Sequence, residues 1–155
     1  MSVFGAIAPE FANEAFAAAV VLPVPYDETS TWLKGADRGP EAIITASANM
    51  ELYDIETQSE VYRRGIFTAP PIREKRTPEA MVAAVREQAA AYIERGKFVL
   101  TVGGEHSVSI GAIQAHAARW PNLSVLQLDA HADLREAYEG SAFNHACVMA
   151  RVRES

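Results

Sequence analysis

Short, continuous apolar runs alternate along the chain with segments whose apolar residues recur at helical spacing. Runs of four to nine apolar residues that are bounded by proline, glycine or polar residues are typical of buried strands. On this basis the sequence predicts strands at 16–24, 61–68, 97–102 and 123–128. Helices are predicted between and after these strands, at 41–49, 77–95, 107–119 and 145–155.

The helix predicted at 77–95 has the clearest signals. Thr77 can cap it, Pro78 suits the first helical position, and Gly96 follows its last turn. Its apolar residues recur at helical spacing and predict one buried face, made of Met81, Val82, Val85, Ala89, Tyr92 and Ile93.

Strands that alternate with helices indicate an α/β fold with a mostly parallel sheet. The segment 97–128 is predicted to form a strand–helix–strand crossover, which is right-handed in such sheets. No stretch has the composition of a linker, so we expect the 155 residues to belong to a single domain.

Composition and charge narrow the classes of function. Fourteen basic and twenty acidic residues give a net charge of −6, which argues against a nucleic-acid-binding surface and is compatible with a cationic substrate. The single cysteine, Cys147, excludes an internal disulfide and a multi-cysteine metal cluster, and we expect it in the core. The presence of only one cysteine makes a reducing, cytoplasmic location the expected one. The longest apolar run, 15–22, is too short to span a bilayer.

Candidate chemistry is concentrated late in the chain, because all four histidines lie between positions 106 and 145. The first candidate site is the Gly-Gly-Glu-His-Ser segment at 103–107, which follows a predicted strand and opens a helix. In α/β sheets, ligands bind beyond the carboxyl ends of the strands. Two alternatives are a phosphate loop, whose full glycine spacing is missing, and a plain strand–helix turn with an incidental histidine.

The second candidate is the Asp-Ala-His-Ala-Asp segment at 129–133. Alternate residues of extended backbone point to the same side, so Asp129, His131 and Asp133 can converge. Two carboxylates and an imidazole suit a divalent ion such as Mn²⁺, Mg²⁺, Fe²⁺ or Zn²⁺. A solvated turn with helix-capping aspartates is the alternative, but the strand before the segment and its proximity to His106 favour a metal site.

Two further histidines are placed differently. His145 follows a potential capping residue, Asn144, and near a metal site it could shuttle protons. His116 lies inside a predicted helix, and we expect it to be a surface or packing residue.

Taken together, these motifs resemble those of the ureohydrolases, the arginase and agmatinase family. Segment 101–109 resembles the family's first metal motif and 128–135 the second, while 24–29 and 39–43 are similar to its N-terminal region. The resemblance extends from about residue 18 to 154, and the segments 133–140 and 144–149 are most similar to agmatinases.

This resemblance implies a three-layer α/β/α sandwich with a dinuclear Mn²⁺ centre. His106, Asp129 and Asp133 would bind one ion and His131 and Asp129 the other, with Asp129 bridging. Glu105 would support these ligands without binding metal. His145 would contact substrate or transfer a proton, and Asp133 would also serve in catalysis.

The implied reaction is hydrolysis of agmatine, in which metal-activated water attacks the guanidinium carbon and releases urea and putrescine. Arginine or a guanidino acid is the alternative substrate, and the complete enzyme is expected to be a homo-oligomer. The family's third motif, Ser-x-Asp-x-Asp, is absent, so the chain is expected to be the N-terminal part of a domain truncated at its C-terminus. The alternatives are an inactive fragment, a metal-binding partner completed by another chain, and an α/β protein without metal.

Overall fold

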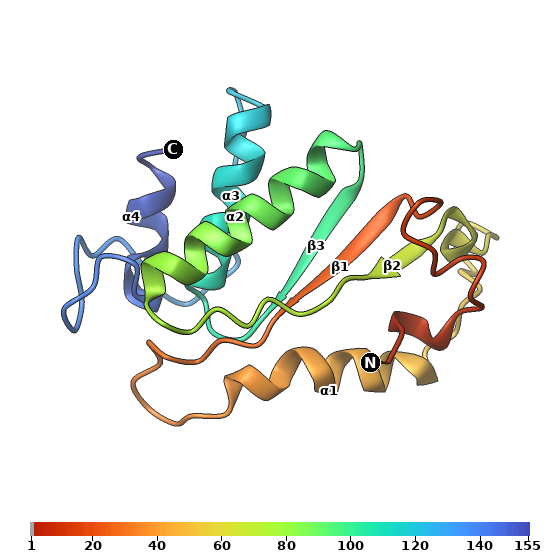
Figure 1. Ribbon diagram of the computed structural model, residues 1–155, viewed down its shortest axis with the longest axis horizontal. Coiled ribbons are helices and arrows are strands. Elements are labelled where there is room, and N and C mark those ends of the chain that lie inside the picture. The colour runs from red at the N-terminus through yellow and green to blue at the C-terminus, as the bar shows by residue number, and fades with distance from the viewer. Residues whose placement is uncertain (1) are drawn as a thin grey trace.

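A parallel three-stranded sheet forms the centre of the computed structural model, which describes residues 2–155 (Figure 1). The strand order is β2-β1-β3, with bounds β1 Ala19–Val24, β2 Ile66–Thr68 and β3 Phe98–Gly103. Ala19 of β1 pairs with the first residue of each neighbour, so the three carboxyl ends lie toward the same edge. The predicted α/β class with a mostly parallel sheet is confirmed.

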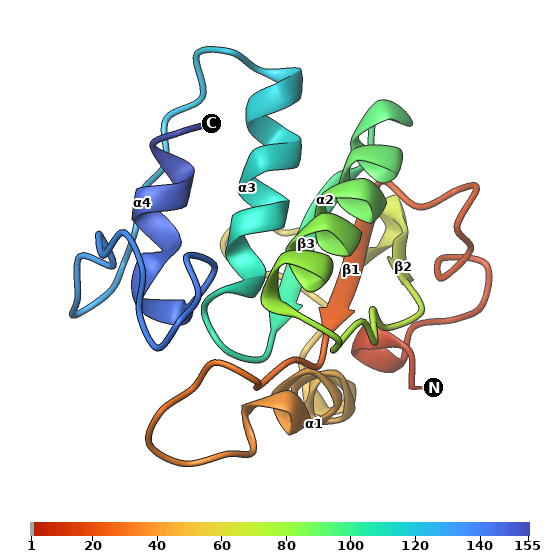
Figure 2. The same ribbon diagram turned by 60° about the vertical axis from the view of Figure 1, so that its left-hand side comes forward.

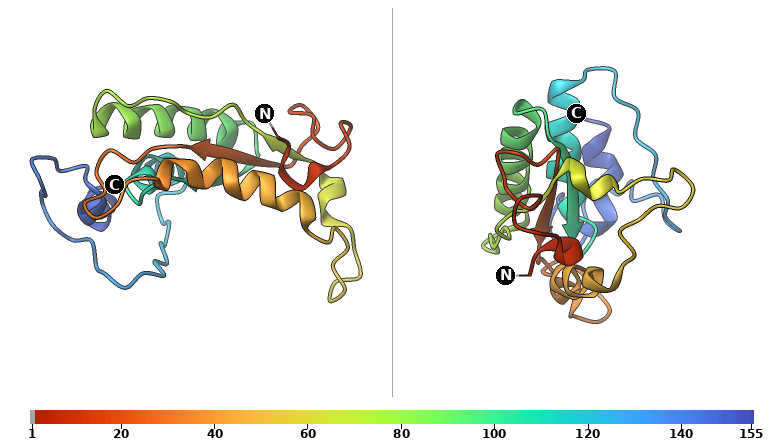
Figure 3. Two further views of the ribbon diagram at one scale, coloured as in Figure 1. Left: turned by 90° about the horizontal axis from the view of Figure 1, so that it is seen from below. Right: turned by 90° about the vertical axis from the view of Figure 1, so that its right-hand side faces the viewer.

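Helices lie on both faces of this sheet (Figure 3). Helix α1 (Gly39–Ala46) covers one face and α2 (Pro78–Glu94) the other, while α3 (Val108–Arg119) packs along α2. A side chain at Gly111 would put its Cβ 2.3 Å from the backbone oxygen of Val82, so a glycine at this position permits the close approach of α3 to α2. Helix α4 (Val148–Val152) packs against α3 (Figure 2).

Each sequence signal that predicted α2 has its expected role in the structure. The Thr77 hydroxyl accepts a hydrogen bond from the Ala80 N–H at 3.1 Å, and Pro78 is the first helical residue. The helix ends before Gly96, whose φ of +73° is in the left-handed region. The predicted apolar face is buried in full, at Met81, Val82, Val85, Ala89, Tyr92 and Ile93.

Buried residues form two apolar clusters. One joins β1 and β3 to the second half of α2, and the other joins the carboxyl end of β1 to α2, the start of α3 and α4. Cys147 is fully buried beside the second cluster, as its apolar surroundings predicted. Burial raises the pKa of its thiol.

The prediction of a strand at 123–128 is wrong. This segment pairs with no strand within residues 2–155, and the side chains of Leu126 and Leu128 are 83% and 89% exposed. It lies in the connection between α3 and α4 (Figure 2), and Leu123 lines a pocket with Val99 and Thr101 of β3 without pairing with that strand. An apolar run becomes a strand only when a neighbouring strand satisfies its backbone hydrogen bonds, and here none does. The crossover predicted over 97–128 therefore ends at α3.

Three other predicted elements are shorter than expected. The strand at 61–68 is reduced to β2, because 61–64 forms a 3-10 turn and Gly65 has a φ of +82°. The strand at 16–24 begins at Ala19, and the last helix consists of a 3-10 turn at His145–Cys147 followed by α4. Within residues 2–155, no helix has the length and apolar character needed to cross a membrane.

Candidate metal centre

The turn between β3 and α3 is packed tightly against the chain that leaves β1. A Cβ on Gly104 would lie 2.0 Å from the carbonyl oxygen of Tyr26, so only glycine fits there. The next residue, Glu105, donates its backbone N–H to the same oxygen at 2.9 Å. These contacts fix the turn that carries His106.

Glu105 is buried, and its carboxylate accepts three hydrogen bonds. Its Oε1 accepts from the hydroxyls of Thr29 and Ser107, both at 2.7 Å, and its Oε2 accepts from the Ser107 N–H at 2.8 Å. Both oxygens are therefore engaged inside the protein. This carboxylate stabilises the turn next to His106 and is not one of the candidate metal ligands.

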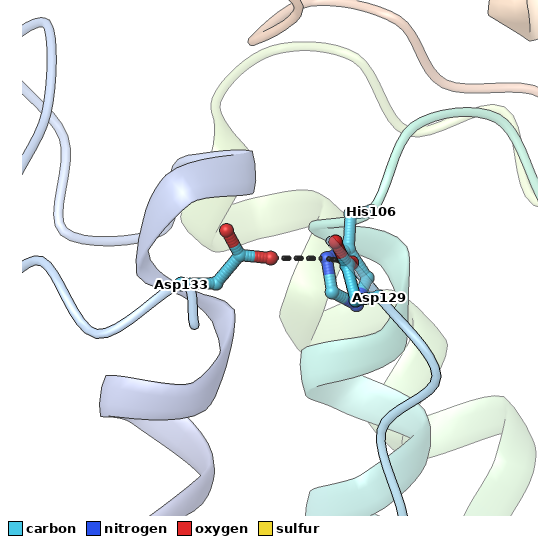
Figure 4. A group of neighbouring side chains, drawn as sticks. All are labelled: His106, Asp129 and Asp133. Carbon is cyan, nitrogen blue, oxygen red and sulfur yellow. Dashed lines mark hydrogen bonds and ion pairs between the residues drawn. The ribbon is translucent and has the colours of Figure 1, made fainter. Parts of the chain in front are cut away.

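His106, Asp129 and Asp133 form one cluster (Figure 4). The Nδ1 of His106 lies 2.6 Å from Oδ2 of Asp133 and 3.5 Å from Oδ2 of Asp129. One potential ligand atom from each residue lies within 4.8 Å of the others. An imidazole nitrogen and two carboxylates suit a divalent ion of intermediate hardness, and the donor set therefore fits the Mn²⁺ that the resemblance implies.

Asp133 is held in place by α4. Its carbonyl oxygen accepts from the N–H groups of Met149 and Ala150 at 3.0 and 3.2 Å. Its φ of +48° places it in the left-handed region, which costs a non-glycine residue about 1–2 kcal/mol. The first turn of α4 thus stabilises the backbone conformation that turns this carboxylate toward His106.

Asp129 and His131 lie on the exposed segment that follows residues 123–128. The His131 N–H donates to Oδ1 of Asp129 at 2.9 Å and holds the pKa of this carboxyl below its usual value. The His131 ring lies outside the cluster, with its side chain 83% exposed and its Nδ1 3.7 Å from Asp129. The structure brings three of the four expected ligands together and leaves His131 apart.

His145 lies beside Thr29. Its Nδ1 is 2.8 Å from the Thr29 carbonyl oxygen, and its backbone N–H donates to the Thr29 hydroxyl at 3.0 Å. The Asn144 side chain accepts from the Ala146 N–H and shapes the turn on which His145 sits. The sequence did not single out Thr29, although it lies in the segment 24–29 that carried the resemblance, because a threonine in a polar loop has no distinctive chemistry.

His116 is half-buried on α3, where its Nδ1 is 2.8 Å from the Ala112 carbonyl oxygen and its ring stacks on Trp120. It takes no part in the cluster. Within residues 2–155, no further group of histidine, cysteine or carboxylate ligands comes together.

The layers and the cluster define an α/β protein with a candidate divalent-metal centre beside the carboxyl end of its parallel sheet. Comparison with known proteins identifies the family within this class. Residues 17–155 match the model of the arginase family, and the chain belongs to this family.

Individual relatives agree with this assignment. The chain is 42% identical to an N(1)-aminopropylagmatine ureohydrolase of Synechocystis sp., over 89% of this chain and 47% of that protein. It is 31% identical to an agmatinase of Bacillus subtilis, over 98% of this chain and 52% of that protein. The crystal structure of the agmatine ureohydrolase of Thermoplasma volcanium superimposes with a TM-score of 0.81 at 28% identity, over 94% and 49% of the two chains. The chain thus spans about half the length of these relatives.

Proposed function

We propose that this chain is part of a ureohydrolase that cleaves the guanidinium group of agmatine, or of an N-substituted agmatine, into urea and an amine. The observation that carries the proposal is the cluster of His106, Asp129 and Asp133 in a member of the arginase family. The names of the relatives support a guanidinium compound as substrate.

In this proposal, His106, Asp129 and Asp133 would hold one Mn²⁺ ion, and Asp129 and His131 would contribute to a second. Bound manganese supplies Lewis-acid chemistry and lowers the pKa of a water molecule toward neutrality. Asp129 could contribute to both, because its Oδ2 lies 3.5 Å from Nδ1 of His106 and its Oδ1 lies 3.7 Å from Nδ1 of His131.

Residues of the chain would bind the cationic substrate and protonate the leaving amine. The carboxylates of Asp129 and Asp133 attract and orient a cationic guanidinium, and the net charge of −6 favours its approach. Water adds to the guanidinium carbon, the bond to the alkyl nitrogen breaks, and the departing amine takes a proton. We assign to His145 the contact with the substrate and the delivery of this proton, because an imidazole can both accept and donate a proton.

Two substrates are distinguished by size. Agmatine would yield putrescine, a diamine, whereas aminopropylagmatine would yield a triamine. The higher identity to the aminopropylagmatine enzyme, 42% against 31%, favours the longer substrate. Arginine and guanidino acids are the alternative substrates. We also propose that the complete enzyme is a cytoplasmic homo-oligomer that acts in polyamine synthesis.

Urea release tests this proposal. The complete protein, saturated with Mn²⁺, is assayed against agmatine, N(1)-aminopropylagmatine, arginine and guanidino acids. His106→Ala is expected to lower urea release at least about 100-fold, because it removes a metal ligand. His116→Ala is the matched control, since it removes an imidazole from the same helix region without touching the cluster.

Two results would contradict the proposal. One is a complete protein that releases no urea from any of these compounds, and the other is equal activity in His106→Ala and the wild type. Activity only when a second, different polypeptide is added would favour the alternative of an assembly partner.

A further inference from the structure

We propose that Thr29 is a positioning residue, which holds the imidazole of His145 in the tautomer that carries its hydrogen on Nδ1. The unprotonated Nε2 is then the atom that exchanges a proton with the reacting substrate. This inference rests on the proposed function for its catalytic meaning, but the tautomer itself is a property of the chain.

The tautomer follows from the chemistry of the two atoms that meet. The Nδ1 of His145 lies 2.8 Å from the carbonyl oxygen of Thr29, which is hydrogen-bonding distance. A carbonyl oxygen can only accept, so Nδ1 must be the donor. A neutral imidazole has a single N–H, and Nε2 therefore keeps its lone pair. The Thr29 hydroxyl is 3.5 Å from the same Nδ1 and is the weaker contact.

The hydroxyl of Thr29 has its own role, because it fixes the backbone of His145. It accepts the His145 N–H at 3.0 Å and donates its own hydrogen to Oε1 of Glu105 at 2.7 Å. Donor and acceptor roles are consistent along this series, since the Glu105 carboxylate can only accept. One buried side chain thereby connects the turn that carries His106 to the turn that carries His145, 116 residues away from Thr29 in sequence.

The loop that carries Thr29 is itself held firmly. The carboxylate of Asp27 accepts from the N–H groups of Gly35 and Ala36, which closes the loop at its base. The Nζ of Lys34 donates to the carbonyl oxygens of Asp27 and Glu28 at 2.6 and 3.1 Å. Because the loop is closed on itself, the Thr29 carbonyl is in position before any ligand binds.

The Nδ1–H tautomer suits the departure of an amine. With Nδ1 held as a donor, Nε2 can take up one proton to give an imidazolium, and it can then return that proton to the alkyl nitrogen as the C–N bond breaks. A purely structural role for Thr29 would join the two turns without any preference between the tautomers. The tautomer therefore separates the two roles.

The first test reads the tautomer on the 155-residue chain without metal. Histidine labelled with ¹⁵N is observed by long-range ¹H–¹⁵N correlation NMR at a pH where the ring is neutral. We expect His145 to show Nδ1 protonated in the wild type and in Thr29→Ser, which keeps the hydroxyl. In Thr29→Val, which loses it, the backbone anchor is gone, and we expect a mixture of tautomers.

Thr68→Val is the matched control, because Thr68 is another buried threonine whose hydroxyl accepts one backbone N–H, that of Phe4, outside the site. It should leave the His145 signals unchanged. Protonated Nε2 in the wild type would overturn the proposal, and so would a Thr29→Val spectrum identical to that of the wild type. If Thr29→Val does not fold, the wild-type and Thr29→Ser tautomers still decide the proposal.

The second test measures catalysis by the complete Mn²⁺-loaded protein. Thr29→Val should lower kcat about tenfold or more and change KM less than about threefold, because proton delivery suffers more than binding. Thr29→Ser should restore most of kcat. An equal kcat in Thr29→Val and Thr68→Val would contradict the positioning role. If no form of the protein releases urea, the proposed function fails, while the tautomer measurement still decides the role of Thr29.

Discussion

The candidate site is supplied by two regions that differ in how firmly they are built. His106 sits on a turn that is packed against Tyr26 and braced by the buried Glu105. Asp129 and His131 sit on a segment without strand partners, next to the exposed Leu128. Both regions carry equally clear sequence motifs. The difference teaches that a motif specifies which ligands are present, whereas packing decides which of them are in place before a metal binds.

Asp133 shows how a candidate ligand close to the exposed segment can still be fixed. Its backbone is held by the N–H groups of Met149 and Ala150, so α4 brings the end of the loop back toward α3. The cluster therefore depends on two anchored residues, His106 and Asp133, and on one residue, Asp129, whose segment is exposed.

The largest effect is expected from Gly104→Ala, which places a side chain where the turn before His106 packs most closely against Tyr26. The new Cβ would lie 2.0 Å from the Tyr26 carbonyl oxygen and 2.8 Å from its nitrogen, and backbone must move to admit it. We expect a loss of about 4 kcal/mol or more in the free energy of unfolding, measured by urea denaturation.

Gly39→Ala is the control for that substitution. Its Cβ would meet no atom nearer than 3.5 Å, and the residue has helical backbone angles. It should change stability by less than about 1 kcal/mol. Equal destabilisation by the two substitutions would show that the turn before His106 is not rigid.

The next largest effect comes from comparing the same substitution, leucine to alanine, in the core and in the exposed segment 123–128. Leu22→Ala removes a side chain from the core between β1 and α2, and it should cost about 2–5 kcal/mol because a cavity remains. Leu126→Ala removes a side chain that is 83% exposed, and it should change stability by less than about 0.5 kcal/mol. Thermal and urea unfolding of the 155-residue chain measure both. A comparable cost at the two positions would mean that residues 123–128 are packed in solution.

Affinity for Mn²⁺ would distinguish the candidate ligands inside the cluster from His131, which lies outside it. Asp133→Ala should weaken the first Mn²⁺ bound to the chain about 100-fold, because it removes a carboxylate 2.6 Å from His106. His131→Ala should weaken it less than about threefold, since its ring lies outside the cluster. Isothermal titration calorimetry or Mn²⁺ electron paramagnetic resonance gives both constants. Equal losses would place His131 among the ligands of the first ion.

The elements that the sequence predicted well are those specified by local signals. The cap at Thr77, the apolar face of α2 and the glycines that end elements act within a few residues, and each has its expected place in the structure. The motif at 103–107 was recognisable for the same reason, because glycine, strand end and helix start are neighbours in sequence.

The features that sequence reasoning missed depend on distant partners. Residues 123–128 have the apolar pattern of a strand, but a strand needs a neighbour to accept and donate its hydrogen bonds, and the apolar pattern of this run says nothing of that neighbour. The role of Thr29 depends on contacts with Glu105 and His145, which are 76 and 116 residues away. Nothing in the local pattern of the polar loop indicates these contacts.

The smallest expected effect concerns the loop that carries Thr29, and it depends on pH. Burial by itself raises the pKa of the Asp27 carboxyl, but hydrogen bonds from Ser30, Gly35 and Ala36 outweigh it and lower the pKa below its usual value. A carboxyl whose pKa is lower in the folded state stabilises that state when ionised. This stabilisation is complete above the pKa of the unfolded chain, near 3.8, and it is lost as the pH falls through the folded value.

Asp27→Asn keeps the shape of the side chain and removes the charge. It should cost about 1 kcal/mol at pH 7, because hydrogen bonds to a charged acceptor are replaced by weaker ones or lost. Below about pH 4 the difference from the wild type should shrink, since the wild-type carboxyl also becomes neutral. Urea denaturation of both proteins between pH 7 and pH 2.5 measures this difference. A difference in unfolding free energy that stays constant over this range would show that ionised Asp27 does not hold the loop closed. The firmly held part of the site would then include Glu105 but not the loop that carries Thr29.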